Sequence, residues 1–145
     1  MDPQLKDKNT DDLKQGLMKT ENLDAFLAEN EASFSDESVK DLLRTLFERS
    51  SCTKADLARR CGVSEVYLYQ LLSGIRRPSR DCLISLAIGM NVSLNEMQDL
   101  LHRCGLAELY ARDKRDAVII YGISHGMSPH EVNDLLFDKQ LATLI

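Results

Sequence analysis

The sequence predicts an all-α protein, and three observations support this prediction. Apolar residues recur at i, i+3, i+4, i+7 and i+8 between residues 39 and 47, which is the period of an amphipathic helix. Ser or Thr precedes several apolar segments, with Asp or Glu three residues later, a pattern that caps helix N-termini. Two short apolar segments within residues 53–72 are separated by a glycine, which predicts two helices joined by a sharp turn.

The N-terminal segment is acidic. Residues 1–37 carry 4 Lys or Arg against 10 Asp or Glu, and residues 1–20 show no apolar period, so we expect the latter to be disordered. A weak amphipathic pattern follows, made by Leu23, Phe26, Leu27 and Phe34. It fits either a short helix laid over the domain's own core or an arm that contacts a second subunit or another protein.

The strongest pattern lies in residues 53–79, TKADLARRCGVSEVYLYQLLSGIRRPS. Thr53 is expected to cap the first short helix, with Asp56 reaching back to the Thr53 amide as in a capping box. Gly62 is expected to end that helix, because glycine readily adopts the left-handed conformation. Ser64 is expected to cap a second helix, whose leucines point inward. A basic loop closed by a proline follows.

This pattern resembles the helix-turn-helix of phage repressor and Cro-like proteins, the XRE family, and the resemblance runs without a gap over residues 38–101. It is carried by Thr53, Ala55, Leu57, Ala58, Gly62, Val63, Ser64, Tyr67, Leu68, Leu71, Gly74, Arg76, Pro78 and Ser79. The resemblance implies a five-helix repressor-like domain that binds double-stranded DNA and represses transcription. It also implies that residues 64–72 form the helix that enters the major groove.

The resemblance assigns roles to individual residues. Base reading falls to Glu65, Val66 and Gln70, which have the chemistry to contact cytosine, a thymine methyl and adenine. Contacts to the DNA backbone, and the cap of the reading helix, fall to Thr53, Lys54, Ser64, Tyr67, Arg76 and Arg77. Two departures stand out. Glu65 is a carboxylate where the family often has a basic or amide residue, and Leu72 replaces a common polar residue, so an exposed Leu72 would suit a protein contact.

The distribution of charge agrees with this assignment. The chain has a net charge of -5, yet residues 38–80 carry 9 Lys or Arg against 4 Asp or Glu, whereas residues 81–145 carry 5 against 9. The basic segment therefore coincides with the predicted helix pair, as a surface that faces phosphates requires.

The C-terminal part contains an internal similarity. Residues 83–110 align without a gap on residues 118–145 at an offset of 35, and both copies contain Ser-x-x-Glu. We interpret this as a helical hairpin followed by a Leu-x-x-Leu tail, present twice; the alternative is that hairpins with the same caps merely look alike. The second copy has no basic loop, so we expect it to pack on the domain or on a partner rather than to read DNA.

These patterns predict three parts: an acidic, partly disordered arm over residues 1–35, a DNA-binding domain over residues 36–104 and a helical extension over residues 105–145. The expected state is a homodimer assembled away from the basic face. The candidate dimer or partner surface consists of Leu106, Leu109, Ile119, Ile120, Tyr121, Leu141 and Leu144, with Val118 beside them. The alternative is that the extension packs on its own domain.

Several classes of protein are excluded. No apolar segment is long enough to span a membrane and the start does not read as a signal peptide, so we expect a cytoplasmic protein. The four cysteines show no C-x-x-C pairing and are expected to be small buried thiols, with no metal and no cofactor. No phosphate loop, nucleophile motif or zinc-protease motif is present, so we expect no enzyme.

The rival function is a protein-interaction module, such as an antitoxin-like or adaptor subunit, in which DNA binding is secondary.

Overall fold

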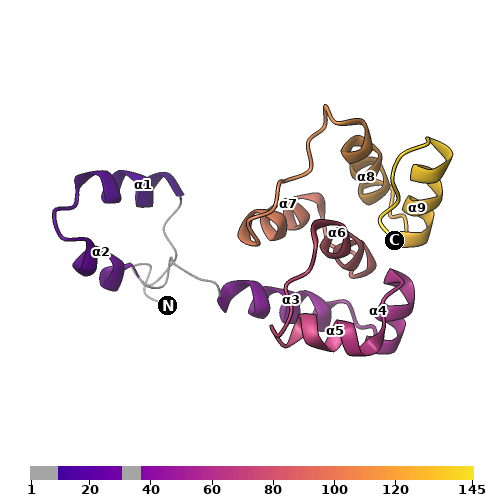
Figure 1. Cartoon of the computed structure of the whole chain (residues 1–145), viewed down its shortest axis with the longest axis horizontal. Helices are drawn as coiled ribbons and strands as arrows, with labels where there is room; N and C mark the ends of the chain where they lie inside the picture. The colour runs from indigo at the N-terminus through magenta and orange to yellow at the C-terminus, as the bar shows by residue number, and fades with distance from the viewer. Residues whose placement is uncertain (1–9, 31–36) are drawn as a thin grey trace. The chain divides into compact units, whose positions relative to one another are not determined.

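The structure, a computed structural model, describes residues 10–30 and 37–145 (Figure 1). Throughout these described residues the regular secondary structure is helical, so the prediction of an all-α fold is confirmed. The chain divides into two compact units, residues 1–37 and residues 38–145. Residues 1–9 and 31–36, including Phe34 of the predicted acidic arm, lie outside the described part.

The described residues of the first unit include helices α1 (Thr10–Lys19) and α2 (Leu23–Glu29). The expectation of disorder is therefore wrong for residues 10–19. Acidic residues in the first turn of α1 and Lys19 in its last turn both complement the helix dipole, a signal that apolar periodicity does not detect.

Phe26 is the buried aromatic residue that joins the two helices of this unit. A Cβ atom on Gly16 would lie 2.6 Å from Phe26 Cε2, so the absence of a side chain on α1 makes room for the ring. Asn22 caps α2 by accepting a hydrogen bond from the Ala25 amide.

The second unit contains the remaining helices. Their bounds are α3 (Glu37–Arg49), α4 (Lys54–Cys61), α5 (Glu65–Leu72), α6 (Arg80–Gly89), α7 (Leu94–Arg103), α8 (Lys114–Ser124) and α9 (Pro129–Asp138). The helices predicted from the apolar period at residues 39–47, and from the caps at Thr53, Ser64 and Ser93, are all confirmed.

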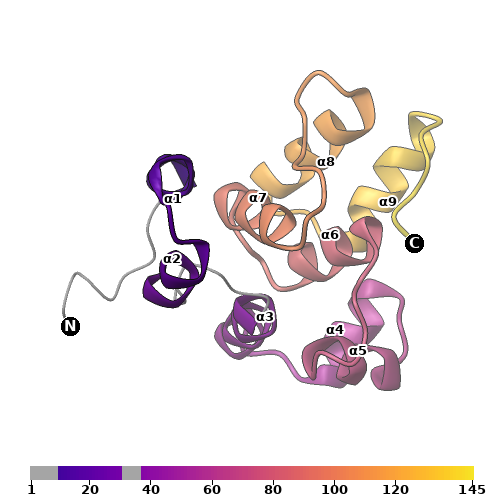
Figure 2. The same ribbon diagram turned by 60° about the vertical axis from the view of Figure 1, so that its left-hand side comes forward.

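Helix α6 forms the centre of the core. Every residue from 83 to 90 is buried, and α6 packs against α4, α7 and α9 (Figure 2). Its surroundings are aliphatic, and the fully buried large side chains of the core are Leu57, Leu68, Leu71, Leu83, Ile84, Leu86, Met90, Met97, Leu100, Leu101, Ile119 and Leu136. Burial of this apolar surface is the main force that holds the helices together.

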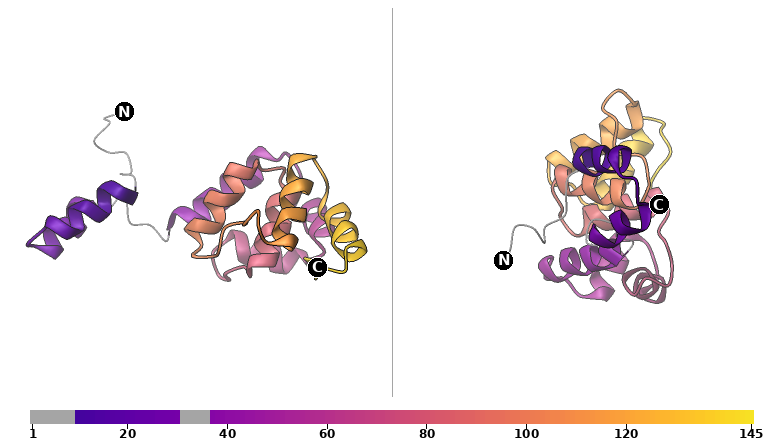
Figure 3. Two further views of the ribbon diagram at one scale, coloured as in Figure 1. Left: turned by 90° about the horizontal axis from the view of Figure 1, so that it is seen from above. Right: turned by 90° about the vertical axis from the view of Figure 1, so that its left-hand side faces the viewer.

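Helices α8 and α9 lie side by side and pack back onto the same unit, α8 against α7 and α9 against α4 and α6 (Figure 3). A Cβ atom on Gly89 of α6 would lie 3.8 Å from Pro129 Cγ at the start of α9. The extension is therefore part of the core of residues 38–145, which is the second of the two alternatives that the sequence leaves open.

This packing corrects the predicted dimer surface. Leu109, Ile119 and Leu144 are buried inside the chain's own core, so they are not available to a second subunit. Four more residues of the predicted surface are half-buried and pack against that core, namely Leu106, Val118, Ile120 and Leu141. Tyr121 remains exposed, at 49 %. Most apolar residues of this segment therefore pack against the core of their own chain.

The structure confirms that the sequence similarity at an offset of 35 is a structural repeat. Ser93 and Glu96 form a complete capping box at α7, and Ser128 and Glu131 form the same box at α9. Both hairpins contain the same turn before the second helix, since Val92 donates to the Ala87 carbonyl and Met127 donates to the Gly122 carbonyl.

Candidate nucleic-acid interface

Helices α4 and α5 are joined by a turn at Gly62, which adopts φ +69° at the C-terminus of α4. A residue with a side chain would be strained in this conformation. The Val63 amide donates to the Ala58 carbonyl at 3.0 Å and closes the turn. This arrangement, in which α5 leaves α4 at a sharp angle and follows it directly, is the helix pair that the sequence predicts (Figure 1).

The caps of the two helices agree with the sequence in part. Thr53 and Ser64 cap α4 and α5 by accepting hydrogen bonds from the Asp56 and Tyr67 amides, both at 3.1 Å. The predicted capping box at α4 is wrong in its second half, because the Asp56 carboxylate accepts from the Arg59 guanidinium at 2.8 Å. Asp56 therefore neutralises a neighbouring cation instead of holding the Thr53 amide.

The reading helix presents the face that the resemblance implies. Glu65, Val66 and Tyr69 are exposed and Gln70 is half-buried, whereas Leu68 and Leu71 lie in the core. Val66 is 67 % exposed, so its methyl groups are accessible to a partner surface.

The prediction that the leucines of this helix point inward is confirmed, since Leu68, Leu71 and Leu72 are all buried. Leu72 is therefore not available for the protein contact that an exposed leucine would have suited.

Cations flank the exposed face of α5, and two of them lie over aromatic rings. Lys54 Nζ lies 5.3 Å from the centre of the Tyr69 ring, and the Arg76 guanidinium carbon lies 5.6 Å from the centre of the Tyr67 ring. Such contacts orient a cation without neutralising it. Partial burial, and then the neighbouring Cys82, raise the pKa of Tyr67 above its ordinary value.

The loop after α5 is held against the end of that helix. Gly74 adopts φ +81°, and the Ile75 and Arg76 amides both donate to the Gln70 carbonyl, at 2.9 and 3.2 Å. These bonds fix the backbone of Arg76 relative to Gln70. The loop thus holds Arg76, one of the predicted phosphate-binding arginines, next to the end of the helix that carries the predicted base reader Gln70.

The availability of positive charge differs among the basic residues of this segment. Arg49, Arg59 and Arg80 form ion pairs with carboxylates. No ion pair is formed by Lys54, Arg76 or Arg77 within the described part of the chain. The cations that the resemblance assigns to DNA are thus uncompensated, as phosphate binding requires. Lys40, Arg44 and Arg60 of the same segment also form no ion pair in the described part of the chain.

Arg44 joins these cations and was missed by sequence reasoning. It lies on the polar side of α3 and lines a hollow of about 320 Å³ together with Lys54 and Tyr69. The amphipathic period of α3 already placed Arg44 away from the core, but only the tertiary structure brings that side of α3 beside α5.

The expectation of small buried thiols holds for Cys61, which is buried, whereas Cys52, Cys82 and Cys104 are half-buried. Burial raises the pKa of Cys61 to about 12 and also raises the pKa values of Cys82 and Cys104, which keeps these thiols protonated and unreactive at neutral pH. In the ranges 10–30 and 37–145, no three His, Cys, Asp or Glu side chains gather in a way that could hold a metal ion.

In a comparison with protein families, residues 41–100 match the model of a helix-turn-helix domain. The matched segment begins within α3 and ends within α7. The match supports a regulator that binds DNA through this domain. Neither the curated proteins nor the solved structures yielded a significant match to the chain. In the described part of the chain, no helix combines the length and the apolar character needed to cross a membrane.

Proposed function

We propose that this protein is a cytoplasmic, sequence-specific transcriptional regulator of the XRE type that acts as a repressor. One observation carries the proposal: the exposed face of α5 is bordered by Lys54, Arg76 and Arg77, which have no ion-pair partner among the described residues. A helix that reads bases in the major groove has phosphates on both sides, because the two DNA strands border the groove. Exposed side chains on α5 with uncompensated cations beside them match this arrangement.

In the proposed complex α5 enters the major groove, which is wide enough for an α-helix. Gln70 offers an amide that can both accept from and donate to adenine, Glu65 offers an acceptor to cytosine, and Val66 offers a methyl surface to thymine. Lys54, Tyr67, Arg76 and Arg77 contact phosphates, and Arg44 extends this set along α3. Thr53 and Ser64 orient their helices and present helix N-termini to the backbone.

Selection of binding sites from random duplex DNA, followed by sequencing, tests this function. The proposal expects one enriched motif, and a reporter placed behind that motif should lose expression when the protein is present. Recovery of unenriched sequences, together with a protein that co-purifies at fixed stoichiometry, would instead support the interaction module. Catalysis is not part of either function.

The homodimer that the resemblance implies is not part of this proposal. Leu109, Ile119 and Leu144, which the sequence assigned to its surface, are buried in the chain's own core, whereas Tyr121 is exposed.

A further inference from the structure

The two C-terminal hairpins contain equivalent internal contacts that extend beyond the segments aligned from the sequence. Arg80 Nε donates to the Ala107 carbonyl at 2.8 Å, and Arg115 Nε donates to the Ala142 carbonyl at 2.8 Å. Both arginine and carbonyl are displaced by the same 35 residues. In each hairpin, an arginine in the first turn of the first helix holds the tail that follows the second helix.

A second contact recurs in the same way. The Gln98 side chain accepts from the Leu109 amide at 2.7 Å, and the Asn133 side chain accepts from the Leu144 amide at 2.7 Å. Each hairpin is therefore closed by an equivalent set of bonds between its helices and its tail. We call residues 80–110 the first hairpin and residues 115–145 the second hairpin.

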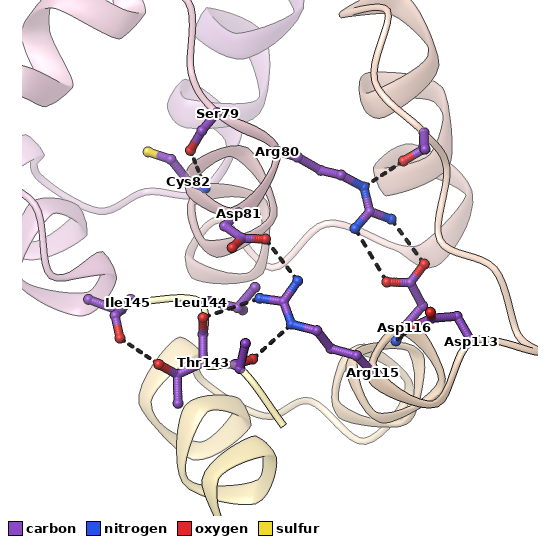
Figure 4. Close-up of polar contacts among 12 residues, drawn as sticks. Ser79, Arg80, Asp81, Cys82, Asp113, Arg115, Asp116, Thr143, Leu144 and Ile145 are labelled. Carbon is purple, nitrogen blue, oxygen red and sulfur yellow. Dashed lines mark hydrogen bonds and ion pairs between the residues drawn. The ribbon is translucent and has the colours of Figure 1, made fainter. Parts of the chain in front are cut away.

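The contacts between the hairpins are reciprocal (Figure 4). Arg80 of the first hairpin forms an ion pair with Asp116 of the second at 3.0 Å, and Arg115 of the second forms one with Asp81 of the first at 3.0 Å. The two arginines are equivalent at an offset of 35, and so are the two aspartates. Helix packing is reciprocal as well, since α6 contacts α9 and α7 contacts α8.

The two ion pairs differ in burial. The side chains of Arg80 and Asp116 are 24 % and 9 % exposed, and those of Arg115 and Asp81 are 20 % and 42 % exposed. Asp116 also accepts from the Tyr110 amide at 3.0 Å. Partly buried charges that are paired and hydrogen-bonded fix one arrangement of the surfaces that carry them. Ile84 and Ile119, which are again equivalent, are both fully buried.

Reciprocal contact between equivalent residues is the signature of an isologous interface, in which a surface pairs with a copy of itself. Here both surfaces belong to one chain. A surface with this complementarity would associate with a second molecule if it were free, but the second hairpin already covers it.

The reading head, which consists of helices α3–α5, occurs once in the described part of the chain. The segment of residues 104–113 that leads into α8 contains no helices equivalent to α3–α5. Close approach of α4 to α6 depends on Gly89, where a Cβ atom would lie 2.8 Å from Cys61 Sγ. The equivalent residue of α8 is the exposed Ser124, whose side chain would obstruct an α4-like helix. A second head therefore does not fit on the second hairpin in the same way.

We infer that the second hairpin takes the place of a second subunit. It occupies, within the chain, the surface by which the first hairpin would pair with another copy, so the protein is a monomer with one reading head. The consequence for DNA rests on the proposed function: one chain binds one DNA site, and that site contains no inverted repeat.

Sedimentation equilibrium of the full chain from about 1 to 100 µM tests the monomer directly and does not depend on DNA. A single species of 16.4 kDa, with a Tm that does not change with protein concentration, is the expected result. A dimer in this range would overturn the inference, even if the protein also bound DNA as proposed.

Charge reversal tests whether the reciprocal ion pairs act within the chain. Asp81→Arg and Arg115→Asp should each lower Tm by roughly 2–8 °C, and the double variant should be more stable than the sum of the two effects. The matched control is the exposed pair on α7, Asp99→Arg with Arg103→Asp, which should show little coupling. If a single reversal produced monomers from a dimeric parent, the pairs would act between chains and the inference would fail.

Titration of the selected DNA site gives the last readout. One protein per site, and a motif that is not palindromic, are expected. Two proteins on an inverted repeat would overturn the inference while leaving the proposed function intact. If the chain proved monomeric but bound no DNA, the proposed function would be wrong and the inference of a monomer would stand.

Discussion

At the scale of single residues, the availability of a cation depends on its neighbours more than on its exposure. The Arg59 side chain is 77 % exposed, yet Asp56 already pairs with it. Arg76 and Arg77 are exposed and form no ion pair among the described residues. The positive charge of Arg59 is therefore partly compensated by Asp56, whereas Arg76 and Arg77 retain their full attraction for phosphate.

Replacing Arg76 and Arg77 with Ala should weaken binding to all DNA sequences. If both contact phosphates, the slope of log K against log salt should flatten by about 1.8, since each phosphate contributes about 0.9. The control removes two exposed cations outside the interface, Arg112→Ala with Lys139→Ala, and should leave the slope near that of the parent. Equal slopes for the parent and the loop variant would remove this loop from the interface.

Gln70→Ala should act on specificity rather than on general affinity. Loss of its side-chain amide should cost about 1–3 kcal/mol at one base position and relax the preference there, with little change in non-specific binding. Selection from random DNA with parent and variant in parallel measures this. The prediction fails if the variant returns the same motif with the same stringency.

Glu96 connects a single ion pair to the pH dependence of stability. Hydrogen bonds from the Arg49 guanidinium, and then from the Ser93 amide, lower the pKa of Glu96 to about 2. A lowered carboxyl pKa stabilises the folded state above the ordinary carboxyl range, and this contribution is lost as the pH falls from about 4.5 to about 2.

Glu96→Gln should therefore lower the free energy of unfolding by about 0.5–1 kcal/mol at pH 7, because it removes an exposed pair but retains a capping side chain. The deficit should shrink towards pH 2. Glu131→Gln is the matched control: it occupies the same capping position at α9 and has no ion pair in the described part of the chain. Urea unfolding at several pH values checks this, and a deficit that stays constant down to pH 2 would contradict it.

At the scale of helices, the sequence reveals what is encoded locally. Caps and apolar periods located α3, α4, α5, α7 and α9, because Ser, Thr and Gly act on the backbone within a few residues. The same signals anticipated the repeat, although the alignment began at residue 83 and so omitted Arg80 and Asp81, whose equivalents are Arg115 and Asp116. Extending the alignment by three residues at the same offset would have shown that Arg-Asp recurs, whereas the pairing of each arginine with the other hairpin's aspartate depends on the tertiary structure.

What could not be predicted depends on contacts between distant segments. The burial of Leu109, Ile119 and Leu144 follows from where α8 and α9 fold back, and an apolar pattern is the same whether its partner is the same chain or another. Arg44 enters the candidate site for a similar reason, through the packing of α3 beside α5. Helix α1 was missed because its stabilising charges lie outside any apolar period.

Gly89 offers a test of how closely α4 and α6 pack. In an isolated helix, Gly to Ala is favourable by about 1 kcal/mol. Here the new Cβ would lie 2.8 Å from Cys61 Sγ and 2.9 Å from Leu57 Cδ1, both in a filled core. Overpacking costs about 1–3 kcal/mol, so Gly89→Ala should be net destabilising by about 1 kcal/mol.

The matched control is Ser124→Ala at the equivalent, exposed position of α8, which should be neutral or slightly stabilising. Urea unfolding of both variants measures the difference. A stabilised Gly89→Ala variant would show that the α4–α6 contact has room for a methyl group.

At the scale of the whole molecule, the charge of one unit opposes the proposed function of the other. Residues 1–37 contain 4 Lys or Arg and 10 Asp or Glu, a net charge of -6, in a chain of net charge -5. An acidic unit tethered to a DNA-binding unit repels DNA at long range wherever it lies, and salt screens that repulsion within about 10 Å at 0.1 M.

Deleting residues 1–37 should therefore accelerate DNA association without unfolding the remaining unit. Removing a charge of -6 from -5 leaves +1, and residues 38–145 form a compact unit of their own. We expect an association rate at least about threefold higher at low ionic strength, and equal rates near 0.5 M salt, with little change in Tm. Stopped-flow fluorescence on labelled DNA provides the rates.

A full-length control reaches the same net charge of +1 by changing six acids of this unit to amides, at Asp2, Asp7, Glu21, Asp24, Glu29 and Glu31. If charge is the cause, this variant should associate as fast as the deletion and show the same salt dependence. Acceleration by the deletion alone would mean that the unit hinders DNA through its bulk rather than its charge. Unchanged rates in both variants would mean that the acidic unit has no part in DNA association.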